Sequence, residues 1–266
     1  MLRLRLGDLQ SSLGRSFLQD SRVVQETPTE IFVSFGPVSP HLVFETLAYT
    51  IGFALYRSMR ARSTDFLPDA SRWTSIVAAA LGAAAGSKLL ALVSEPSMWS
   101  ERLASPIAYM ASGKTIVGGL LGGWLAVELV KRFQGIHERT GDLYALPLCI
   151  GIAIGRIGCF LTGLPDRTYG VATSVPWAID FGDGTPRHPT QLYEIVFLLI
   201  LALTVRRLPE QRERGSNFRR FLAGYFGWRL AIDFLKPGDR FVGMTGIQWA
   251  CFAAISWLTW ERVRRR

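Results

Sequence analysis

The fold is decided by one long apolar stretch, residues 142–163, which reads DLYALPLCIGIAIGRIGCFLTG. A helix that crosses a bilayer core needs roughly 17–25 mostly apolar residues, so this stretch is long enough to span a membrane. Six further apolar stretches, several of them shorter, lie at 43–56, 73–93, 115–130, 190–205, 221–235 and 247–260. Extension of the helix into the interface makes up for a short stretch. The sequence therefore predicts an all-α, polytopic membrane protein with seven transmembrane helices.

The composition excludes several other classes of protein. Of the 266 residues, 49% are hydrophobic and 19% are charged, which is too apolar for a disordered chain. The three cysteines are too few for a disulfide scaffold. A formal net charge of +9 suggests nucleic-acid binding in a soluble protein, but in a hydrophobic chain it indicates basic loops that face anionic lipid. We therefore expect a membrane as the partner and no nucleic acid.

The distribution of Lys and Arg predicts the orientation in the membrane. The connecting segments 57–72, 131–141, 206–220 and 262–266 carry 17 basic residues in 47 positions. The alternate segments 1–42, 94–114, 163–189 and 236–246 carry 10 in 101 positions. Cytoplasmic loops are enriched in Lys and Arg, so the first set is expected inside the cell. A hydrophobic soluble helical protein, the alternative, has no reason to sort its charges in this way.

This topology divides the chain into three parts. Residues 1–42 are expected to form an N-terminal extension at the interface or in the periplasm. Residues 43–261 form the seven-helix transmembrane domain, with an external segment, 163–189, between the fourth and fifth helices. Residues 262–266 form a basic cytoplasmic tail. The N-terminus is then outside, the C-terminus is cytoplasmic, and the protein is a multi-pass protein of a bacterial inner membrane.

Charged residues remain inside the predicted spans. The basic ones are Lys88, Arg156 and Arg229, and their candidate acidic partners are Glu45, Glu194 and Asp233. An isolated charge at mid-helix costs about 2.5–3.5 kcal/mol on insertion scales, so such residues pair or face a polar cavity. The pairs could serve helix packing alone. We favour an anion site, because a guanidinium binds phosphate oxygens through two parallel hydrogen bonds. The sequence does not fix the relative depths of Arg156 and Arg229.

Four motifs occur in a fixed order along the chain. Residues 117–123 read VGGLLGG, 155–160 read GRIGCF, 187–194 read RHPTQLYE and 224–229 read GYFGWR. In order and spacing they resemble those of the prolipoprotein diacylglyceryl transferase family, over about Phe35 to Trp260. That family comprises bacterial inner-membrane enzymes with seven transmembrane helices. They move the diacylglyceryl group of phosphatidylglycerol to the thiol of a lipobox cysteine in a prolipoprotein.

The resemblance implies roles for the matching residues. Arg156 and Arg229 are expected to stabilise charge on the phosphate, and His188 or Glu45 to accept the thiol proton. The other expected substrate contacts are Tyr49, Lys88, Gly118, Gly119, Arg187, Gln191, Tyr193, Glu194 and Asp233. Phosphatidylglycerol, or a related anionic phospholipid, and a lipobox peptide are the expected partners. We expect no cofactor, no metal and a monomeric protein.

The chain departs from the family's motifs at several positions. Val117 stands for a histidine, Cys159 and Thr162 for asparagines, Leu164 for a glutamate and Glu45 for a tyrosine. These departures keep an alternative open. A diverged member of the family could bind anionic phospholipid but use another acceptor, or have lost catalysis. A small-solute transporter is a third possibility, although no inverted repeat is visible in the sequence.

Several candidates also have a purely structural interpretation. RHPTQ could cap a helix, with Pro189 at the first helical position. Gly118 and Gly119 could serve close helix packing, and Lys88 could form a packing ion pair. His41 and His137 fall on opposite predicted sides of the membrane, and the sequence shows no spacing typical of a metal site.

Overall fold

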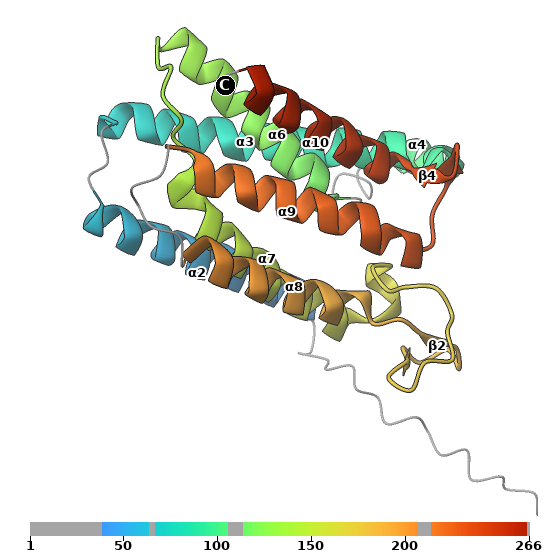
Figure 1. Ribbon diagram of the computed structural model, residues 1–266. Coiled ribbons are helices and arrows are strands. Elements are labelled where there is room, and N and C mark those ends of the chain that lie inside the picture. Colours follow the sequence, from blue (N-terminus) through green and yellow to red (C-terminus); the bar gives the residue numbers. More distant parts are fainter. Residues whose placement is uncertain (1–38, 64–66, 106–113, 207–213, 265–266) are drawn as a thin grey trace, which may run out of the picture. The chain divides into compact units, whose positions relative to one another are not determined.

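A computed structural model describes the chain over residues 39–63, 67–105, 114–206 and 214–264. These residues are mostly helical, as Figure 1 shows, so the prediction of an α-helical fold is confirmed. The predicted N-terminal extension, 1–42, lies outside the described residues except for its last four positions.

Each predicted apolar stretch coincides with a helix. Within the described residues the long helices are α2 (Pro40–Arg62), α3 (Asp69–Ser94), α6 (Ile116–Phe133), α7 (Asp142–Thr162), α8 (Thr190–Arg206), α9 (Ser216–Ile232) and α10 (Gly246–Arg264). Local sequence explains the start of α2, where the Ser39 hydroxyl accepts a hydrogen bond from the Leu42 amide and Pro40 occupies the first turn. Thr115 caps α6 in the same way, through the Gly118 amide.

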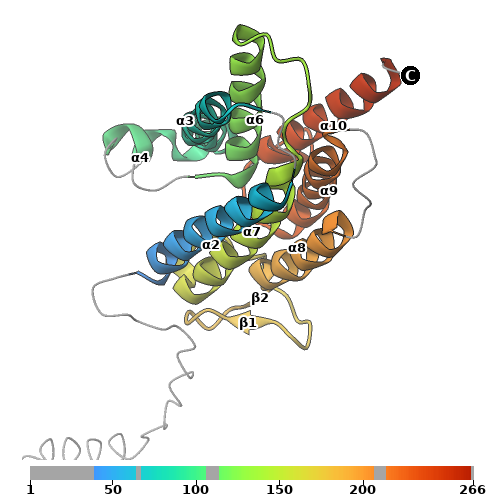
Figure 2. The same ribbon diagram turned by 90° about the vertical axis from the view of Figure 1, so that its left-hand side faces the viewer.

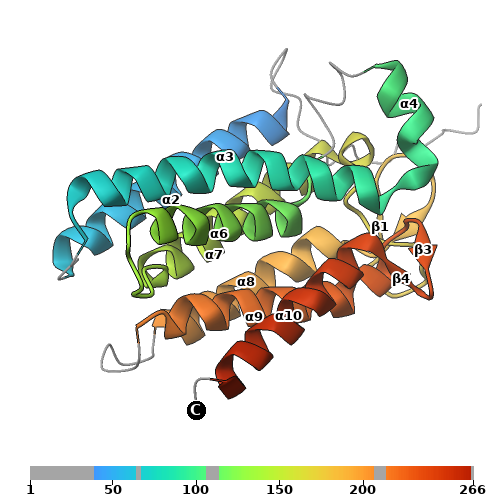
Figure 3. The ribbon, with the colours of Figure 1, turned by 90° about the horizontal axis from the view of Figure 1, so that it is seen from above.

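The short elements gather at one end of the helical bundle (Figures 1 and 3). They are η1 (Pro96–Met98), α4 (Trp99–Ala104), η2 (Leu164–Asp166), η3 (Asp233–Leu235), β1 (Ile179–Asp180), β2 (Pro186–Arg187), β3 (Arg240–Phe241) and β4 (Met244–Thr245). β1 and β2 pair antiparallel, with Ile179 opposite Arg187, and β3 pairs with β4. The predicted external segment, 163–189, therefore contains a 3-10 turn and a hairpin between α7 and α8.

The long helices pack in neighbouring pairs. α3 lies along α6, α2 along α7, α7 along α8, and α9 along α10, as Figures 2 and 3 show. The most buried apolar side chains lie where α7 to α10 meet, and include Cys149, Leu198, Phe221, Tyr225 and Cys251. This core holds α7, α8 and α9 together, and these helices carry Arg156, Glu194 and Arg229.

A carboxylate at the start of α7 fixes the position of α9. The Asp142 side chain accepts hydrogen bonds from the backbone amides of Gly215, Asn217 and Phe218, at 2.6, 2.9 and 3.0 Å. These amides belong to the N-terminal end of α9, whose first turn has no intrahelical acceptors. Asp142 therefore caps α9 and aligns it with α7 at the end far from the hairpins.

Apolar side chains cover much of the outer surface of the helices. On α3, Val77 and Val93 are 55% and 63% exposed, and Leu129 of α6 is 55% exposed. By length and hydropathy, α3 and α7 are each able to cross a membrane. Exposed apolar side chains in this number are suited to lipid rather than to water.

Four glycines set the close approach of α3 and α6. A Cβ atom added to Gly82 or Gly86 of α3 would collide with the backbone of Gly122 or Gly118 of α6, and the reverse also holds. Small residues in this arrangement let helix backbones touch in lipid. At Gly118 the geometry thus favours the helix-packing alternative.

We predict that Gly122→Leu separates α3 from α6 and destabilises the protein, because the new side chain has no space. Overpacking of a well-packed contact costs about 1–3 kcal/mol, and more where backbone is the obstacle. A lower thermal unfolding midpoint in nanodiscs is the expected result.

Gly227→Ala in α9 is the control, because nothing lies within 4 Å of an added Cβ at that position. We expect this variant to be as stable as the original chain or slightly more so. Equal unfolding midpoints for the Gly122 and Gly227 variants would show that the α3–α6 contact is not close-packed.

Candidate functional site

The buried carboxylate of Glu194 on α8 lies at the centre of a charged cluster. Its side chain is fully buried. The Arg156 Nε and Nη2 atoms lie 2.9 and 3.1 Å from the two carboxylate oxygens. Arg229 Nη1 lies 3.6 Å away and Lys236 Nζ lies 3.8 Å away. The Glu194 carboxylate on α8 therefore contacts three cations from different segments. They are Arg156 of α7, Arg229 of α9 and Lys236, which follows η3.

Two further groups complete this cluster. The Tyr225 hydroxyl donates a hydrogen bond of 2.6 Å to Glu194 Oε1. Asp233 Oδ1 lies 2.7 Å from Arg229 Nη2, one helical turn along the same face. We call these six residues the Glu194 cluster: Arg156, Glu194, Tyr225, Arg229, Asp233 and Lys236.

The Glu194 cluster carries more positive than negative charge. With Lys236 protonated, its three cations face two carboxylates, which leaves a net charge of +1. A buried, uncompensated charge is unfavourable. The Arg229 Nε atom is buried and has no hydrogen-bond partner among the described residues. The cluster is thus electrostatically suited to one monoanion, and a phosphodiester has that charge.

Lys236 makes the charge of the Glu194 cluster depend on pH. Burial, together with the positive charges of Arg229 and Arg156, lowers the pKa of Lys236 to about 7. Glu194 and Asp233 act in the opposite direction. The cluster therefore changes from a net +1 to neutral as the pH rises through 7.

The Glu194 cluster opens into a large cleft. The cleft has a volume of about 2820 Å³ and is lined by α2, α3, α6 and α7, together with Arg156, Arg229, Asp233 and Lys236. Pockets for drug-sized ligands usually measure about 300–1,000 Å³. This cleft has room for a lipid headgroup and a peptide segment together.

A row of polar side chains on α2 faces the same cleft. Glu45 pairs with Lys114, whose Nζ atom lies 3.0 Å from Oε1, and it accepts a hydrogen bond of 3.2 Å from the Tyr49 hydroxyl. His41 Nε2 lies 3.6 Å from Glu45 Oε2. Lys88 of α3 lines the cleft as well. Glu45, Tyr49 and Lys88, all predicted as site residues, thus share one cavity with Arg156 and Arg229.

Four predicted residues lie elsewhere, around the start of α8. Arg187 pairs with Asp183 at 2.6 and 2.7 Å and stacks over the Tyr169 ring. The hydrogen bonds from Arg187 lower the pKa of the Asp183 carboxyl. His188 Nδ1 lies 3.2 Å from the Tyr193 hydroxyl, which accepts a bond from Trp177.

None of these four residues lines the cleft. They are Arg187, His188, Gln191 and Tyr193. Backbone bonds tie His188 to Gly170 and Val171, which favours the capping alternative for this motif. Gln191 is buried, and neither of its amide atoms has a partner among the described residues.

Gly119 lines the cleft, but Val117, which stands where the family has a histidine, does not. Val117 is 1% exposed and belongs to the hydrophobic core. A Cβ atom added at Gly119 would make only ordinary van der Waals contacts with α3. Gly119 therefore borders the cleft without a side chain of its own. No proton acceptor can therefore come from residue 117.

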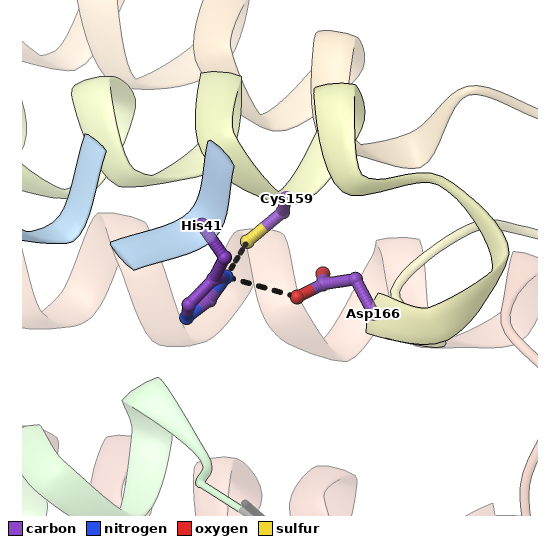
Figure 4. A group of neighbouring side chains, drawn as sticks. All are labelled: His41, Cys159 and Asp166. Atoms are coloured by element: carbon purple, nitrogen blue, oxygen red, sulfur yellow. Dashed lines mark hydrogen bonds and ion pairs between the residues drawn. The ribbon is translucent and has the colours of Figure 1, made fainter. Parts of the chain in front are cut away.

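The structure also brings together three side chains that the sequence analysis did not connect. His41 Nδ1 lies 3.0 Å from Asp166 Oδ1 and 3.8 Å from Cys159 Sγ (Figure 4). Burial raises the pKa of Asp166, but hydrogen bonds from His41 and Thr168 outweigh it and hold the pKa below its usual range. These groups come from α2, η2 and α7 and lie on the wall of the cleft.

Tyr225 and Lys236 are the members of the Glu194 cluster that sequence reasoning missed. The predicted span ended at residue 235, so Lys236 was assigned to an external loop. The spacing of Lys236 could have revealed it. Arg229, Asp233 and Lys236 stand at i, i+4 and i+7, which places all three on one face of a helix. The structure also shows how Arg156 and Arg229 lie relative to each other. α9 ends at Ile232, so Arg229 lies in its last turn, beside Arg156.

Comparisons with known proteins agree with one another. A family model described as prolipoprotein diacylglyceryl transferase matches residues 31–260. Three relatives carry the name phosphatidylglycerol–prolipoprotein diacylglyceryl transferase. The Methylococcus capsulatus protein is 33% identical over 248 residues, with 88% of each chain covered. The Bordetella parapertussis protein is 31% identical, covering 80% of this chain and 84% of its own. The Cupriavidus necator protein is 30% identical, covering 82% and 86%.

We predict that Glu194→Gln strongly destabilises the protein, because three cations then face one another without the carboxylate between them. Breaking a buried ion pair by removing one partner costs about 3–5 kcal/mol. The matched control is Asp183→Asn, which removes an ion pair at the surface, where solvent screening leaves little effect on stability. Unfolding midpoints in nanodiscs measure both effects. A Glu194→Gln protein as stable as the Asp183→Asn protein would contradict the central position of Glu194.

Proposed function

The chain belongs to the prolipoprotein diacylglyceryl transferase family, and on that premise we propose that it is a lipid-modifying transferase. It moves the diacylglyceryl group of phosphatidylglycerol to the thiol of a lipobox cysteine in a prolipoprotein. The observation that carries the proposal is the Glu194 cluster, a buried cationic group that opens into a cleft between apolar helices. A phospholipid is the anion that reaches such a cleft from a membrane.

The Glu194 cluster holds the phosphate of the donor lipid. Arg156 and Arg229 present planar guanidinium groups, and Glu194 fixes both of them. Because their positions are set before the lipid arrives, little reorganisation is needed when charge develops. The free Arg229 Nε donor and the Lys236 ammonium supply further contacts.

The reaction places its largest charge change on the phosphate. The acceptor sulfur attacks the glyceryl carbon next to the phosphate oxygen, so a C–S bond forms and a C–O bond breaks. The electron pair of the broken bond goes to the oxygen, and glycerol 1-phosphate leaves. The phosphate group gains a negative charge as it leaves, and the cationic groups bind it more strongly in the transition state than in the donor lipid.

The proton of the acceptor thiol needs a base within the cleft. Of the two predicted bases, Glu45 lines the cleft, with a side chain that is 24% exposed, and His188 does not. Glu45 is therefore the better candidate for general base in this chain. Tyr49, Lys88 and Lys114 lie on the same wall, where they contact the headgroup or the peptide.

The proposed topology follows the charge distribution and the helix positions. The long helices form a multi-pass inner-membrane domain, with the N-terminus outside and the tail, 262–266, in the cytoplasm. Segment 163–189 is then external, and the Glu194 cluster lies near the outer half of the bilayer. A single chain supplies every residue of the site, so a monomer is sufficient.

We predict that Arg156→Gln and Arg229→Gln each lower the rate of transfer by about 100-fold or more, the usual effect of losing a group that stabilises transition-state charge. The assay uses the purified protein, phosphatidylglycerol labelled in its acyl chains, and a lipobox peptide. The measured quantity is label on the peptide.

Arg262→Gln is the control, because this arginine is exposed at the far end of α10. It should retain full activity, and phosphatidylcholine should not serve as donor. Full activity in the Arg156 or Arg229 variant would contradict the phosphate role. Lipid binding without transfer in the unaltered protein would favour a diverged function.

We predict that binding of phosphatidylglycerol weakens as the pH rises through 7. Lys236 loses its charge over this range, while the phosphodiester stays anionic, so the dissociation constant rises by up to about tenfold per pH unit above the pKa. Lipid binding to delipidated protein, followed by native mass spectrometry between about pH 6 and pH 9, measures it.

The Lys236→Arg variant keeps its charge at every pH in this range and should bind with an affinity that barely changes. The same pH dependence in both proteins would mean that another group is responsible.

A further inference from the structure

Three potential metal ligands converge on the wall of the cleft. They are His41 at the start of α2, Cys159 near the end of α7, and Asp166 in η2 (Figure 4). Their ligand atoms all lie within 4.8 Å of one another. Figure 4 shows that one ring nitrogen of His41 faces both the Cys159 sulfur and the Asp166 carboxylate.

A hydrogen bond uses that shared nitrogen toward only one of its two neighbours. His41 Nδ1 carries either one proton or one lone pair, so it can serve one of its two neighbours well. In a tetrahedral zinc site, with Zn–N and Zn–O of about 2.0–2.1 Å and Zn–S of about 2.3 Å, neighbouring ligand atoms lie about 3.3–3.6 Å apart. The observed 3.0 Å to Asp166 and 3.8 Å to Cys159 fall close to either side of this range.

Each of two ligands is held in place by a partner outside the group. The Thr168 hydroxyl donates a hydrogen bond of 2.6 Å to Asp166 Oδ2, which leaves Oδ1 facing His41. Glu45 Oε2 lies 3.6 Å from His41 Nε2, the ring nitrogen that faces away from the cluster. Metal-bound histidines typically have a carboxylate or carbonyl partner on the second ring nitrogen, which fixes the tautomer.

The donor set and its charge select the ion. Magnesium and calcium prefer oxygen ligands, whereas a mixture of imidazole, thiolate and carboxylate suits zinc. Neutral His41 with a thiolate and a carboxylate carries a charge of −2, which a divalent cation balances. The Arg156 guanidinium lies beside this group, with Nη1 3.8 Å from Cys159 Sγ. We propose that His41, Cys159 and Asp166 bind one zinc ion.

The site keeps one side open to the cleft. The Cys159 residue and the Asp166 side chain are 7% and 9% exposed, whereas the His41 side chain is 38% exposed. Three protein ligands with an open fourth position are the arrangement of catalytic rather than structural zinc sites. A water molecule, or a thiol that enters the cleft, can take the fourth position, and zinc lowers the pKa of either.

The test measures zinc in the purified full-length chain, prepared without a histidine tag, stripped with EDTA and dialysed against low-micromolar zinc. Elemental analysis should find about one zinc per chain. Cys159→Ser and Asp166→Asn should each retain less than a tenth of it at the same free zinc concentration. Cys149→Ser and Cys251→Ser are matched controls, because these cysteines are buried and lie outside the proposed zinc site. Both variants should bind as much zinc as the original chain does.

Cobalt gives a second readout that does not depend on activity. Cobalt bound to the original chain and to Cys149→Ser should show a thiolate-to-metal charge-transfer band, and Cys159→Ser should lack this band. The unfolding midpoint of Cys159→Ser shows whether that variant is folded. If the original chain binds no more zinc than the Cys159 and Asp166 variants, or shows no such band, the group is a hydrogen-bonded cluster and the proposal is wrong. These measurements need neither lipid nor peptide, so their outcome is separate from that of the transfer assay.

Discussion

The carboxylate of Glu194 is the constraint on which the site depends. It is fully buried, and Arg156, Arg229 and Lys236 lie against it from three different segments. Without it, three cations would repel one another in a low-dielectric interior, where each unpaired charge is costly. With it, the arginines are fixed, and with Asp233 as the second carboxylate one positive charge remains uncompensated. A single acid thus makes the cations compatible with the fold and leaves them able to bind an anion.

The rest of the fold positions the Glu194 cluster and provides the cleft through which a substrate reaches it. α7, α8 and α9 pack through a common apolar core, and Asp142 aligns α9 with α7 from the opposite end. The α3–α6 pair is held together by its own glycines, so the large cleft remains between it and the α2–α7 pair. The cleft has an apolar exterior around it and charged groups within it. That combination suits a substrate that is itself part lipid and part phosphate.

Much of this could be predicted from the sequence, and the remainder has physical reasons. Hydrophobic stretches located every long helix, because burial in lipid needs uninterrupted apolar residues. Charges inside those stretches identified Arg156, Arg229, Glu194 and Asp233, since an intramembrane charge needs a partner. Lys236 was missed because a hydropathy window ended one residue before it. His41, Cys159 and Asp166 are 118 and 7 residues apart along the chain, and spacing alone does not reveal ligands supplied by separate elements. His188 matched a motif, but its contacts are with the hairpin segment.

The central claim is that the Glu194 cluster binds the phosphate of an anionic lipid. The most direct measurement is an experimentally determined structure of the protein in phosphatidylglycerol nanodiscs. We expect the phosphate oxygens of a bound lipid at hydrogen-bonding distance, about 2.7–3.2 Å, from Arg156 and Arg229, with Glu194 still between them. A lipid phosphate bound elsewhere, with these arginines closed off from the cleft by their carboxylates, would contradict the account.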